Sequence, residues 1–336
     1  MLTDRFTDRA QTVLRTDRLI FRAGVWKPRT SPHTFQGAGT RALEWLQAVK
    51  RTYGLPVATE VATPEHVAAA LEAGMDYLWI GARTSANPIA VQEIAEAIGN
   101  YQSTQSIPNN LNDLKGILIK NPVNADAALW LGNIERLEKT GVPVMAVHRG
   151  CDHQPCWSMA HQVRIARPDL PMLLDPSHMS GDATQVPALM QKVAELGLDG
   201  AMVEVHCCPE EALSDSNQQI TPTLLRDALD SFASRLRLVS VFSNTNRQQD
   251  ETELNWLRAE IDELDDLLWE TIAARMDVST RIGEWKKAHG VAPLQPERYK
   301  EIRERLKMKG ESLGLSEEFM LSVWDKIHEQ SLKQQA

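Results

Sequence analysis

The sequence alternates short apolar segments with amphipathic helical segments, and each apolar segment ends in a charged or polar side chain. Seven such segments follow one another, and the residues at their ends are Arg22, Glu60, Arg83, Lys120, Arg149, His178 and Glu204. Strands that alternate with helices predict a parallel α/β fold. A barrel carries functional side chains at the end of every strand, whereas a doubly wound open sheet gathers them at one switch point. The pattern therefore favours a (β/α)8 (TIM) barrel, of which seven strands are visible.

The boundaries of the expected elements follow from the apolar spacing. We expect strands at about 18–23, 55–61, 77–81, 116–120, 142–147, 172–174 and 200–203. We expect helices at about 3–16, 38–53, 64–73, 88–98, 124–139 and 186–196. A polar insert at 100–113 and a region without a clear pattern at 151–169 interrupt this alternation.

After about residue 240 the pattern changes from alternation to a long helical repeat. Apolar residues recur every three or four positions from Leu254 to Ile282, which predicts one helix over about 251–289. Such a helix is roughly 60 Å long, and the residues that follow it suffice only for two shorter helices. Because these cannot cover the long helix, we expect a second chain to complete the core. We divide the chain into a barrel domain, 1–240, a linker, 241–250, and an all-helical dimerising domain, 251–336.

Charge and composition exclude several classes of protein. The 336 residues carry a net charge of −9, which argues against a general nucleic-acid-binding protein. The first five residues contain no apolar signal core, and no apolar run reaches the length of about 18 residues that a membrane helix needs. The four cysteines form neither a zinc-like pattern nor a disulfide framework. We expect a cytoplasmic enzyme that binds neither nucleic acid nor membrane.

The loop after the first strand, Phe21–Pro32, concentrates groups that bind anions. Arg22, Lys27 and Arg29 fall within eight residues of one another, next to the hydroxyl groups of Thr30 and Ser31. Pro28 and Pro32 stiffen the segment, so it is a rigid loop. Guanidinium, ammonium and hydroxyl groups on one loop suit a phosphate or carboxylate ligand. A solvated basic turn is the alternative, and the loop alone does not decide between the two.

Seven motifs in order resemble those of the short type I branch of the 3-deoxy-7-phosphoheptulonate synthases, over about residues 5–235. They are Lys27-Pro-Arg-Thr-Ser-Pro32 after Arg22, Gly81-Ala-Arg83, Ile119-Lys120, His148-Arg149-Gly150, Asp175-Pro-Ser-His178, Glu204-Val-His206 and Leu213-Ser-Asp215. The resemblance implies condensation of phosphoenolpyruvate with erythrose 4-phosphate on a divalent metal.

The resemblance also implies a role for each of these residues. Phosphoenolpyruvate binding is assigned to Arg22, Arg83, Lys120 and Arg149. Lys27 would lie between the substrates and protonate the aldehyde oxygen, and the sugar phosphate is assigned to Lys27, Arg29 and Thr30. Metal binding is assigned to His178, Glu204 and Asp215, and such mixed N/O ligands suit Mn, Fe, Co or Zn.

Alternatives stand beside several of these assignments. A lone His178 in a Pro-Ser-His turn is often structural, and Glu60 fits either a place beside the ligands or a surface salt bridge. His148 and His206 fit orienting or packing roles. Asp175 fits a residue that orients its neighbours better than one that binds substrate.

One departure from the family concerns its fourth metal ligand, a cysteine in a Gly-Pro-Cys-Ser segment that ends the first barrel strand. No such segment precedes the helix expected at 3–16. We therefore expect an N-terminally shortened barrel that lacks its first strand and has little or no synthase activity. A rival on the same fold makes an octulosonate phosphate, but the Lys-Pro-Arg-Thr motif argues against it. A second rival is a non-catalytic barrel that regulates or scaffolds the helical domain.

The tail resembles the all-helical chorismate mutases, in which chorismate rearranges to prephenate without a cofactor. The residues that match the family's site are Arg258, Arg275, Lys286, Arg298, Ser331 and Gln335. The resemblance assigns the ether oxygen to Lys286 and Gln335 and the carboxylates to the arginines. At 100° per residue Arg275 and Lys286 share a helix face and Arg258 does not, so we expect Arg258 to serve the partner chain's site. Two positions depart from the family: Tyr299 replaces a glutamate and Gln295 an aspartate.

Overall fold

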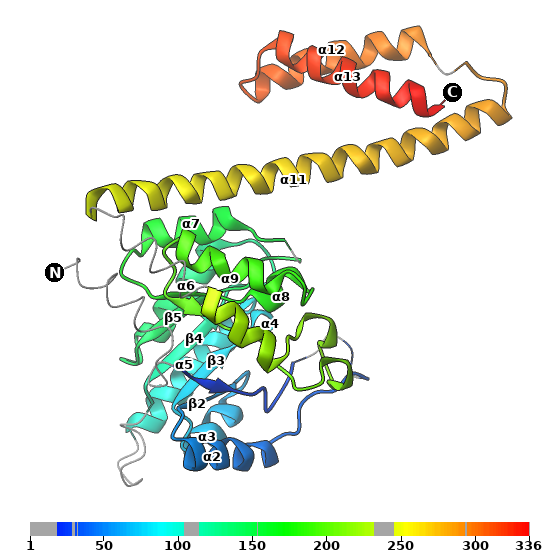
Figure 1. Ribbon diagram of the computed structural model, residues 1–336. Helices are drawn as coiled ribbons and strands as arrows, with labels where there is room; N and C mark the ends of the chain where they lie inside the picture. Colours follow the sequence, from blue (N-terminus) through cyan, green and yellow to red (C-terminus); the bar gives the residue numbers. More distant parts are fainter. Residues whose placement is uncertain are drawn as a thin grey trace. The chain divides into compact units, whose positions relative to one another are not determined.

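The computed structural model describes residues 19–28, 31, 33–103, 114–152, 154–231, 245–292 and 294–335. Seven parallel strands form one sheet in chain order, and each strand pairs with the next (Figure 1). The strands are β1 (Phe21–Arg22), β2 (Val57–Glu60), β3 (Tyr77–Ile80), β4 (Gly116–Lys120), β5 (Val144–His148), β6 (Met172–Leu174) and β7 (Gly200–Ala201). Because all pairs are parallel, the carboxyl ends of the strands meet at one rim.

The sheet is buried on both faces, as β4 illustrates. Ile117 and Ile119 belong to the apolar core between sheet and helices, whereas Leu118 belongs to a smaller cluster with Trp79, Val147 and Met202. Side chains alternate between the faces of a strand, so the smaller cluster fills the concave side of the sheet. A sheet covered on both faces is typical of barrels built from parallel strands.

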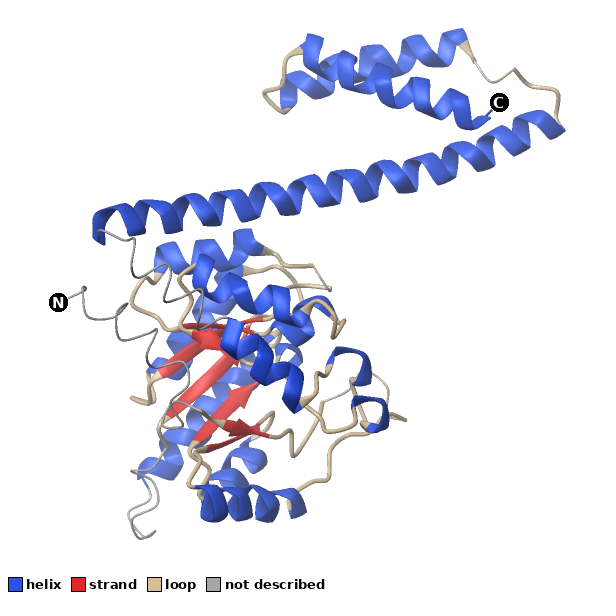
Figure 2. Cartoon of the chain, viewed as in Figure 1, coloured by secondary structure: helices blue, strands red, loops and turns tan. Residues whose placement is uncertain are grey.

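Helices cover the outer face of the sheet, as Figure 2 shows. They are α2 (Arg41–Tyr53), α3 (Pro64–Glu72), α5 (Pro88–Ser103), α6 (Ala127–Glu138), α7 (Trp157–Ala166) and α9 (Val186–Glu195). Caps fix where two of them begin. The Thr63 hydroxyl accepts a hydrogen bond from the backbone N–H of His66 at α3, and the Asp126 carboxylate accepts one from the N–H of Leu129 at α6.

The predicted barrel strands and helices are confirmed in order, with differences in detail. The region at 151–169, for which we expected no regular element, contains α7, in which Trp157, Ala160 and Val163 bury one helical face. α5 continues to Ser103, inside the expected polar insert, and β7 ends at Ala201. The helix expected at 3–16 lies outside the described residues.

The sheet has two edges among the described strands, β1 and β7. β1 pairs only with β2, over Phe21 and Arg22, and the Phe21 side chain is exposed. β7 pairs with β6 over two residues. Both edge strands are therefore the shortest of the sheet, and both lead directly into residues of the predicted site.

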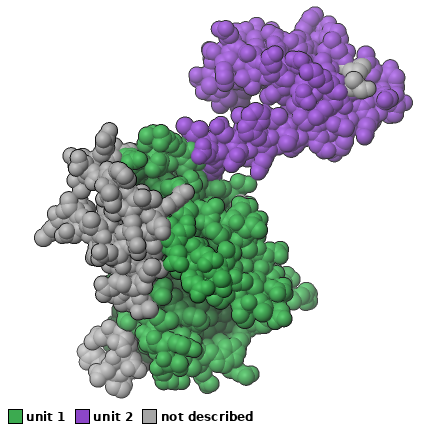
Figure 3. Space-filling model, viewed as in Figure 1, with its two compact units in different colours: residues 1–260 green, residues 261–336 purple. Residues whose placement is uncertain are grey.

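The chain packs as two compact units, residues 1–260 and 261–336, which Figure 3 colours separately. The long helix α11 (Thr245–Ala288) contributes to both. It begins inside the segment expected to be a linker, because Arg and Gln at 247–249 are good helix formers. Our division into domains at 240 and 251 stays a prediction. By its internal packing, the first unit extends beyond both positions, to Glu260.

The first turns of α11 belong to the barrel unit. Trp256 is buried, its indole N–H donates to the carbonyl of Leu196 at 3.1 Å, and its ring stacks on His161. The second unit contains the remainder of α11 with α12 (Pro296–Ser312) and α13 (Glu317–Gln335), so the two expected shorter helices are confirmed. None of the described helices is both long and apolar enough to span a membrane.

Candidate active sites

A cavity of about 400 Å³ lies at the carboxyl ends of the strands. Its lining includes the cations Arg22, Lys27, Arg83, Lys120 and Arg149 and the acids and histidine Glu60, His178, Glu204 and Asp215. Parallel pairing thus brings nine of the residues singled out in the sequence to one place. Arg29 and Thr30, predicted to hold a sugar phosphate, lie outside the described residues.

Two guanidinium groups in this cavity have buried donors without a hydrogen-bond partner. They are Nε and Nη2 of Arg22 and Nε of Arg149, judged within the described part of the chain. The Arg22 guanidinium lies over the ring of Trp79, 5.2 Å from its centroid, and 3.6 Å from Glu204 Oε1. Buried donors without partners are costly. An anion in the cavity would satisfy them.

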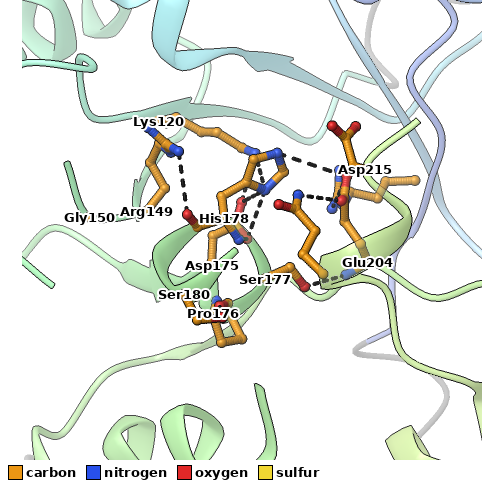
Figure 4. Close-up of polar contacts among 12 residues, drawn as sticks. Lys120, Arg149, Gly150, Asp175, Pro176, Ser177, His178, Ser180, Glu204 and Asp215 are labelled. Atoms are coloured by element: carbon orange, nitrogen blue, oxygen red, sulfur yellow. Dashed lines mark hydrogen bonds and ion pairs between the residues drawn. The ribbon is translucent and has the colours of Figure 1, made fainter. Parts of the chain in front are cut away.

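The ammonium of Lys120 is held by a buried carboxylate. Lys120 Nζ lies 2.7 Å from Asp175 Oδ2, and Asp175 is fully buried (Figure 4). Burial alone would raise the pKa of Asp175, but the charges of His178 and Lys120 hold that pKa well below its ordinary value. Asp175 therefore stays ionised, which matches the orienting role expected for it. It also caps the short helix α8 (Pro176–Ser180) by accepting the backbone N–H of His178.

The three predicted metal ligands line the cavity but do not form a metal site as arranged. His178 Nε2 lies 3.9 Å from Glu204 Oε1, so these two groups face each other. The Asp215 carboxylate instead pairs with Lys27, with Nζ 2.9 Å from Oδ2. Among the described residues no group of three or more His, Cys, Asp or Glu side chains could hold an ion. The donor set therefore does not fit a divalent metal while Lys27 occupies Asp215.

Glycine at position 81 allows Glu60 to reach the cavity. A Cβ at Gly81 would collide with Oε1 of Glu60, which explains the glycine before Arg83 in the motif. Burial raises the pKa of the Glu60 carboxyl, and the positive charges of Lys120 and Arg22 oppose that shift. The two alternatives for Glu60 were a place beside the ligands and a surface salt bridge, and its position corresponds to the first. Arg83 donates to the carbonyl of Pro28 at 3.3 Å.

His148, next to Arg149, supports the rim of the cavity from within the core. It is fully buried, its Nε2 lies 2.6 Å from the carbonyl oxygen of Pro155, and its ring lies between Trp130 and Trp157. Burial lowers its pKa to about 4, against the raising effect of the Pro155 hydrogen bond. The imidazole is therefore neutral near pH 7 and has a packing role.

Sequence reasoning missed two residues that complete this cavity. Gln218 donates to Glu204 Oε2 at 2.8 Å, and Trp79 supplies the ring under Arg22. Gln218 follows Asp215 by three residues, in a short 3-10 helix, Ser216–Gln218. Neither residue has a signal in a single sequence, because glutamine and tryptophan at such positions are common in ordinary packing.

The second unit brings together four of the residues predicted for the tail. Arg275 Nη1 donates to the Ser331 hydroxyl, and Lys286 Nζ donates to Gln335 Oε1 at 3.1 Å. These two pairs join α11 to α13. Burial lowers the pKa of Arg275, and Ser331 is buried whereas Lys286 and Gln335 are half-buried. Two cations and two neutral polar groups therefore share one surface between the helices.

The other two predicted residues do not join this group. Arg298 is exposed and pairs with Glu301 at 2.9 Å, and Arg258 is exposed in the part of α11 that belongs to the first unit. The structure adds a polar cluster that sequence reasoning missed. The Tyr299 hydroxyl donates to Asp325 Oδ1 at 3.0 Å, and Arg303 Nη1 lies 2.8 Å from both Asp325 oxygens.

Comparison with known proteins yields one family match for each part of the chain. Residues 4–233 match the profile of the DAHP synthetase I family. Residues 257–336 match the profile described as chorismate mutase type II. The two family resemblances stated from the motifs agree with these matches.

Three relatives illustrate the likeness. A phospho-2-dehydro-3-deoxyheptonate aldolase of Thermotoga maritima is 30% identical over 216 residues, which cover 62% of this chain and 59% of that protein. A 2-dehydro-3-deoxyphosphooctonate aldolase of Helicobacter pylori is 26% identical over 249 residues, or 69% of this chain and 88% of that protein. A 4-amino-4-deoxychorismate mutase of Streptomyces venezuelae is 37% identical over 78 residues, or 23% of this chain and 76% of that protein.

Among solved structures, the crystal structure of the Thermotoga maritima DAHP synthase is similar, with a TM-score of 0.56 and 25% sequence identity. The match covers 71% of this chain and 67% of that one. A truncated form of the 3-deoxy-D-arabino-heptulosonate 7-phosphate synthase from the same organism has a TM-score of 0.54 at 23% identity, which supports the fold alone. The chain thus spans about three fifths of the length of the Thermotoga maritima aldolase.

The burial of His148 predicts a pH dependence of stability. Its pKa is about 4 in the folded chain and about 6.5 in the unfolded chain. The unfolded state therefore binds more protons between these values, so stability falls as the pH drops from 6.5 to 4, by about 3 kcal/mol in all. We expect the His148→Phe variant to lose this part of the pH dependence in urea unfolding between pH 7 and pH 5. Parallel curves for variant and wild type would contradict a neutral, buried His148.

Proposed function

The chain belongs to the DAHP synthetase I family, and its residues 257–336 belong to the chorismate mutase type II family. From this premise we propose one function in aromatic biosynthesis for each part of the chain. The helical tail rearranges chorismate to prephenate. The barrel binds phosphoenolpyruvate and is built for its condensation with erythrose 4-phosphate. The observation that supports the barrel assignment most directly is the set of buried guanidinium donors at the strand ends that have no partner within the described ranges.

The tail's chemistry requires positioning of a single substrate. Chorismate carries two carboxylates, an ether oxygen and a ring hydroxyl, and the rearrangement needs a compact conformer with the developing charge on the ether oxygen stabilised. Arg275, half-buried and backed by Ser331, is suited to a carboxylate. Lys286 and Gln335 already contact each other and are suited to donate to the ether oxygen together. No cofactor or covalent intermediate is needed.

The tail's site is completed by a second chain in this proposal. Large apolar side chains on α11 are exposed, among them Leu257, Ile261, Leu264 and Leu268. Packing two copies along these residues would bury them and would bring Arg258 of one chain to the other chain's site. We propose a homodimer through the helical domain, acting in the cytoplasm, with no nucleic-acid or membrane partner.

The barrel offers each part of phosphoenolpyruvate a charged partner. Arg22 and Arg149 supply planar donors suited to the phosphate and the carboxylate. Lys120, anchored by Asp175, and Arg83 add charge at two further strand ends. Lys27 is suited to protonate the aldehyde oxygen of the sugar as the carbon–carbon bond forms, with Arg29 and Thr30 assigned to the sugar phosphate. The Lys-Pro-Arg-Thr segment favours erythrose 4-phosphate over the pentose phosphate of octulosonate-forming relatives.

The ion pair between Lys27 and Asp215 limits metal binding in the barrel. The donors His178, Glu204 and Asp215 would hold Mn, Fe, Co or Zn, but Lys27 occupies Asp215 as arranged. Two donors bind a divalent ion weakly compared with the three or four of established metal sites. We therefore propose little or no synthase activity in these 336 residues. The alternative role, a barrel that regulates or scaffolds an active mutase, shares this expectation.

Replacing Arg275 tests the mutase. In Arg275→Ala a substrate carboxylate loses its buried partner, and we expect kcat/KM for chorismate to fall by about two orders of magnitude or more, equivalent to about 3 kcal/mol. The matched control is Arg281→Ala on the same helix, where the arginine is exposed and pairs with Asp277. Disappearance of chorismate measures both. Equal activity in the two variants would contradict the assignment.

The proposed weakness of the metal site has its own test. With phosphoenolpyruvate and erythrose 4-phosphate we expect little turnover on addition of Mn, Fe, Co or Zn. In Lys27→Met the Asp215 carboxylate loses its ion pair with the Lys27 ammonium, and we expect metal affinity by calorimetry to rise about tenfold or more, because a competing cation is removed. Lys139→Met, at an exposed residue, is the control. Rapid turnover with tightly bound metal in the unchanged chain would contradict the proposal.

A further inference from the structure

His328 lies on the face of α13 that carries the mutase residues. At 100° per residue it is within about 60° of Ser331 and Gln335, which contact Arg275 and Lys286 respectively. Burial lowers the pKa of His328, and the nearby charges of Arg275 and Lys286 lower it further, against Asp325. The imidazole is therefore neutral near pH 7.

The His328 ring packs against two aromatic side chains, and one of its nitrogens is buried. The ring stacks on Trp324, with centroids 4.7 Å apart and planes 9° apart, and lies 5.2 Å from the ring of Tyr299. Its Nε2 is buried and has no hydrogen-bond partner among the described residues. A phenylalanine would stack on Trp324 equally well, whereas a buried nitrogen without a hydrogen-bond partner lowers stability. Such an atom is satisfied when a ligand supplies the missing group.

The neighbouring polar groups are engaged with one another. The Tyr299 hydroxyl donates to Asp325, and Arg303 donates to both that hydroxyl, at 3.1 Å, and the Asp325 carboxylate. The Arg303 contact holds the pKa of Asp325 below its ordinary value. Tyr299 thus points its polar atom into this network, whereas His328 Nε2 is without a hydrogen-bond partner among the described residues.

We propose that His328 is a substrate-binding, specificity-determining residue of the tail, whose Nε2 hydrogen-bonds to the ring hydroxyl of chorismate. The inference rests on the proposed mutase function. The cations account for the two carboxylates and the ether oxygen, so the hydroxyl is the substrate's remaining polar group. A neutral imidazole can accept from or donate to a hydroxyl. An ammonium group at the same ring position would instead meet the positive field of Arg275 and Lys286.

The structure therefore assigns a preference for the hydroxyl substrate over its 4-amino-4-deoxy analogue. Both groups can donate to Nε2, but a bond to Nε2 holds the ring substituent near the charges of Arg275 and Lys286, which repel an ammonium group and not a hydroxyl. Removing the bond should affect binding of the hydroxyl substrate more than the rearrangement itself.

The test compares His328→Phe, which keeps the stack on Trp324, with His328→Gln, which keeps a hydrogen-bonding group, in the full-length chain. In His328→Phe we expect KM for chorismate to rise about 10- to 100-fold, with kcat changed less, and the preference for chorismate over 4-amino-4-deoxychorismate to shrink. His328→Gln should recover part of both. His289→Phe is the matched control, because His289 also stacks on a tryptophan, Trp285, but is exposed.

The outcomes separate this inference from the function on which it rests. Wild-type chain without chorismate turnover would overturn both. An active wild type, together with a folded His328→Phe variant whose KM and substrate preference are unchanged, would overturn the inference alone. Thermal unfolding of each variant, compared with His289→Phe, shows whether it is folded.

Discussion

Parallel pairing is the constraint on which the barrel site depends. Each strand pairs with its successor in the same direction, so residues that are far apart along the chain meet at one rim. Arg22 ends β1 and Lys120 ends β4, yet both contact carboxylates, Glu204 and Asp175, that follow the last two strands. The same arrangement gathers five cations around a cavity of about 400 Å³, and such a concentration is stable only if it is balanced.

Carboxylates balance the charge of these cations in part, and the donors that they leave without partners indicate the kind of ligand. Asp175 neutralises Lys120, Glu204 lies beside Arg22, and Asp215 pairs with Lys27. Nε and Nη2 of Arg22 and Nε of Arg149 remain without a hydrogen-bond partner among the described residues. A small dianion would complete these donors without displacing Asp175. A divalent metal, in contrast, needs Asp215, and it would have to compete with Lys27 for that carboxylate.

Much of this site was predictable from the sequence, and the reasons for the remainder are physical. A charge directly after an apolar run, as at Lys120 or Arg149, has few explanations besides a strand end in a barrel. The Lys27–Asp215 pair was not predictable, because the two residues are 188 positions apart and a motif says nothing about which group neutralises a ligand. α7 was missed because Pro155 and Cys156 directly precede it, and the backbone of Cys156 is in the left-handed region. His328 was missed because a single histidine on a helix usually packs.

The central claim is that the cavity at the strand ends is an anion site for phosphoenolpyruvate, whatever the barrel's turnover. Calorimetric titration of phosphoenolpyruvate into the metal-free chain tests it most directly, with Arg149→Met as the variant and the exposed Arg41→Met as control. We expect one ligand per chain, affinity that falls with added salt, and a loss of at least tenfold in Arg149→Met alone. Absence of binding in the wild type, or equal binding in both variants, would contradict the account.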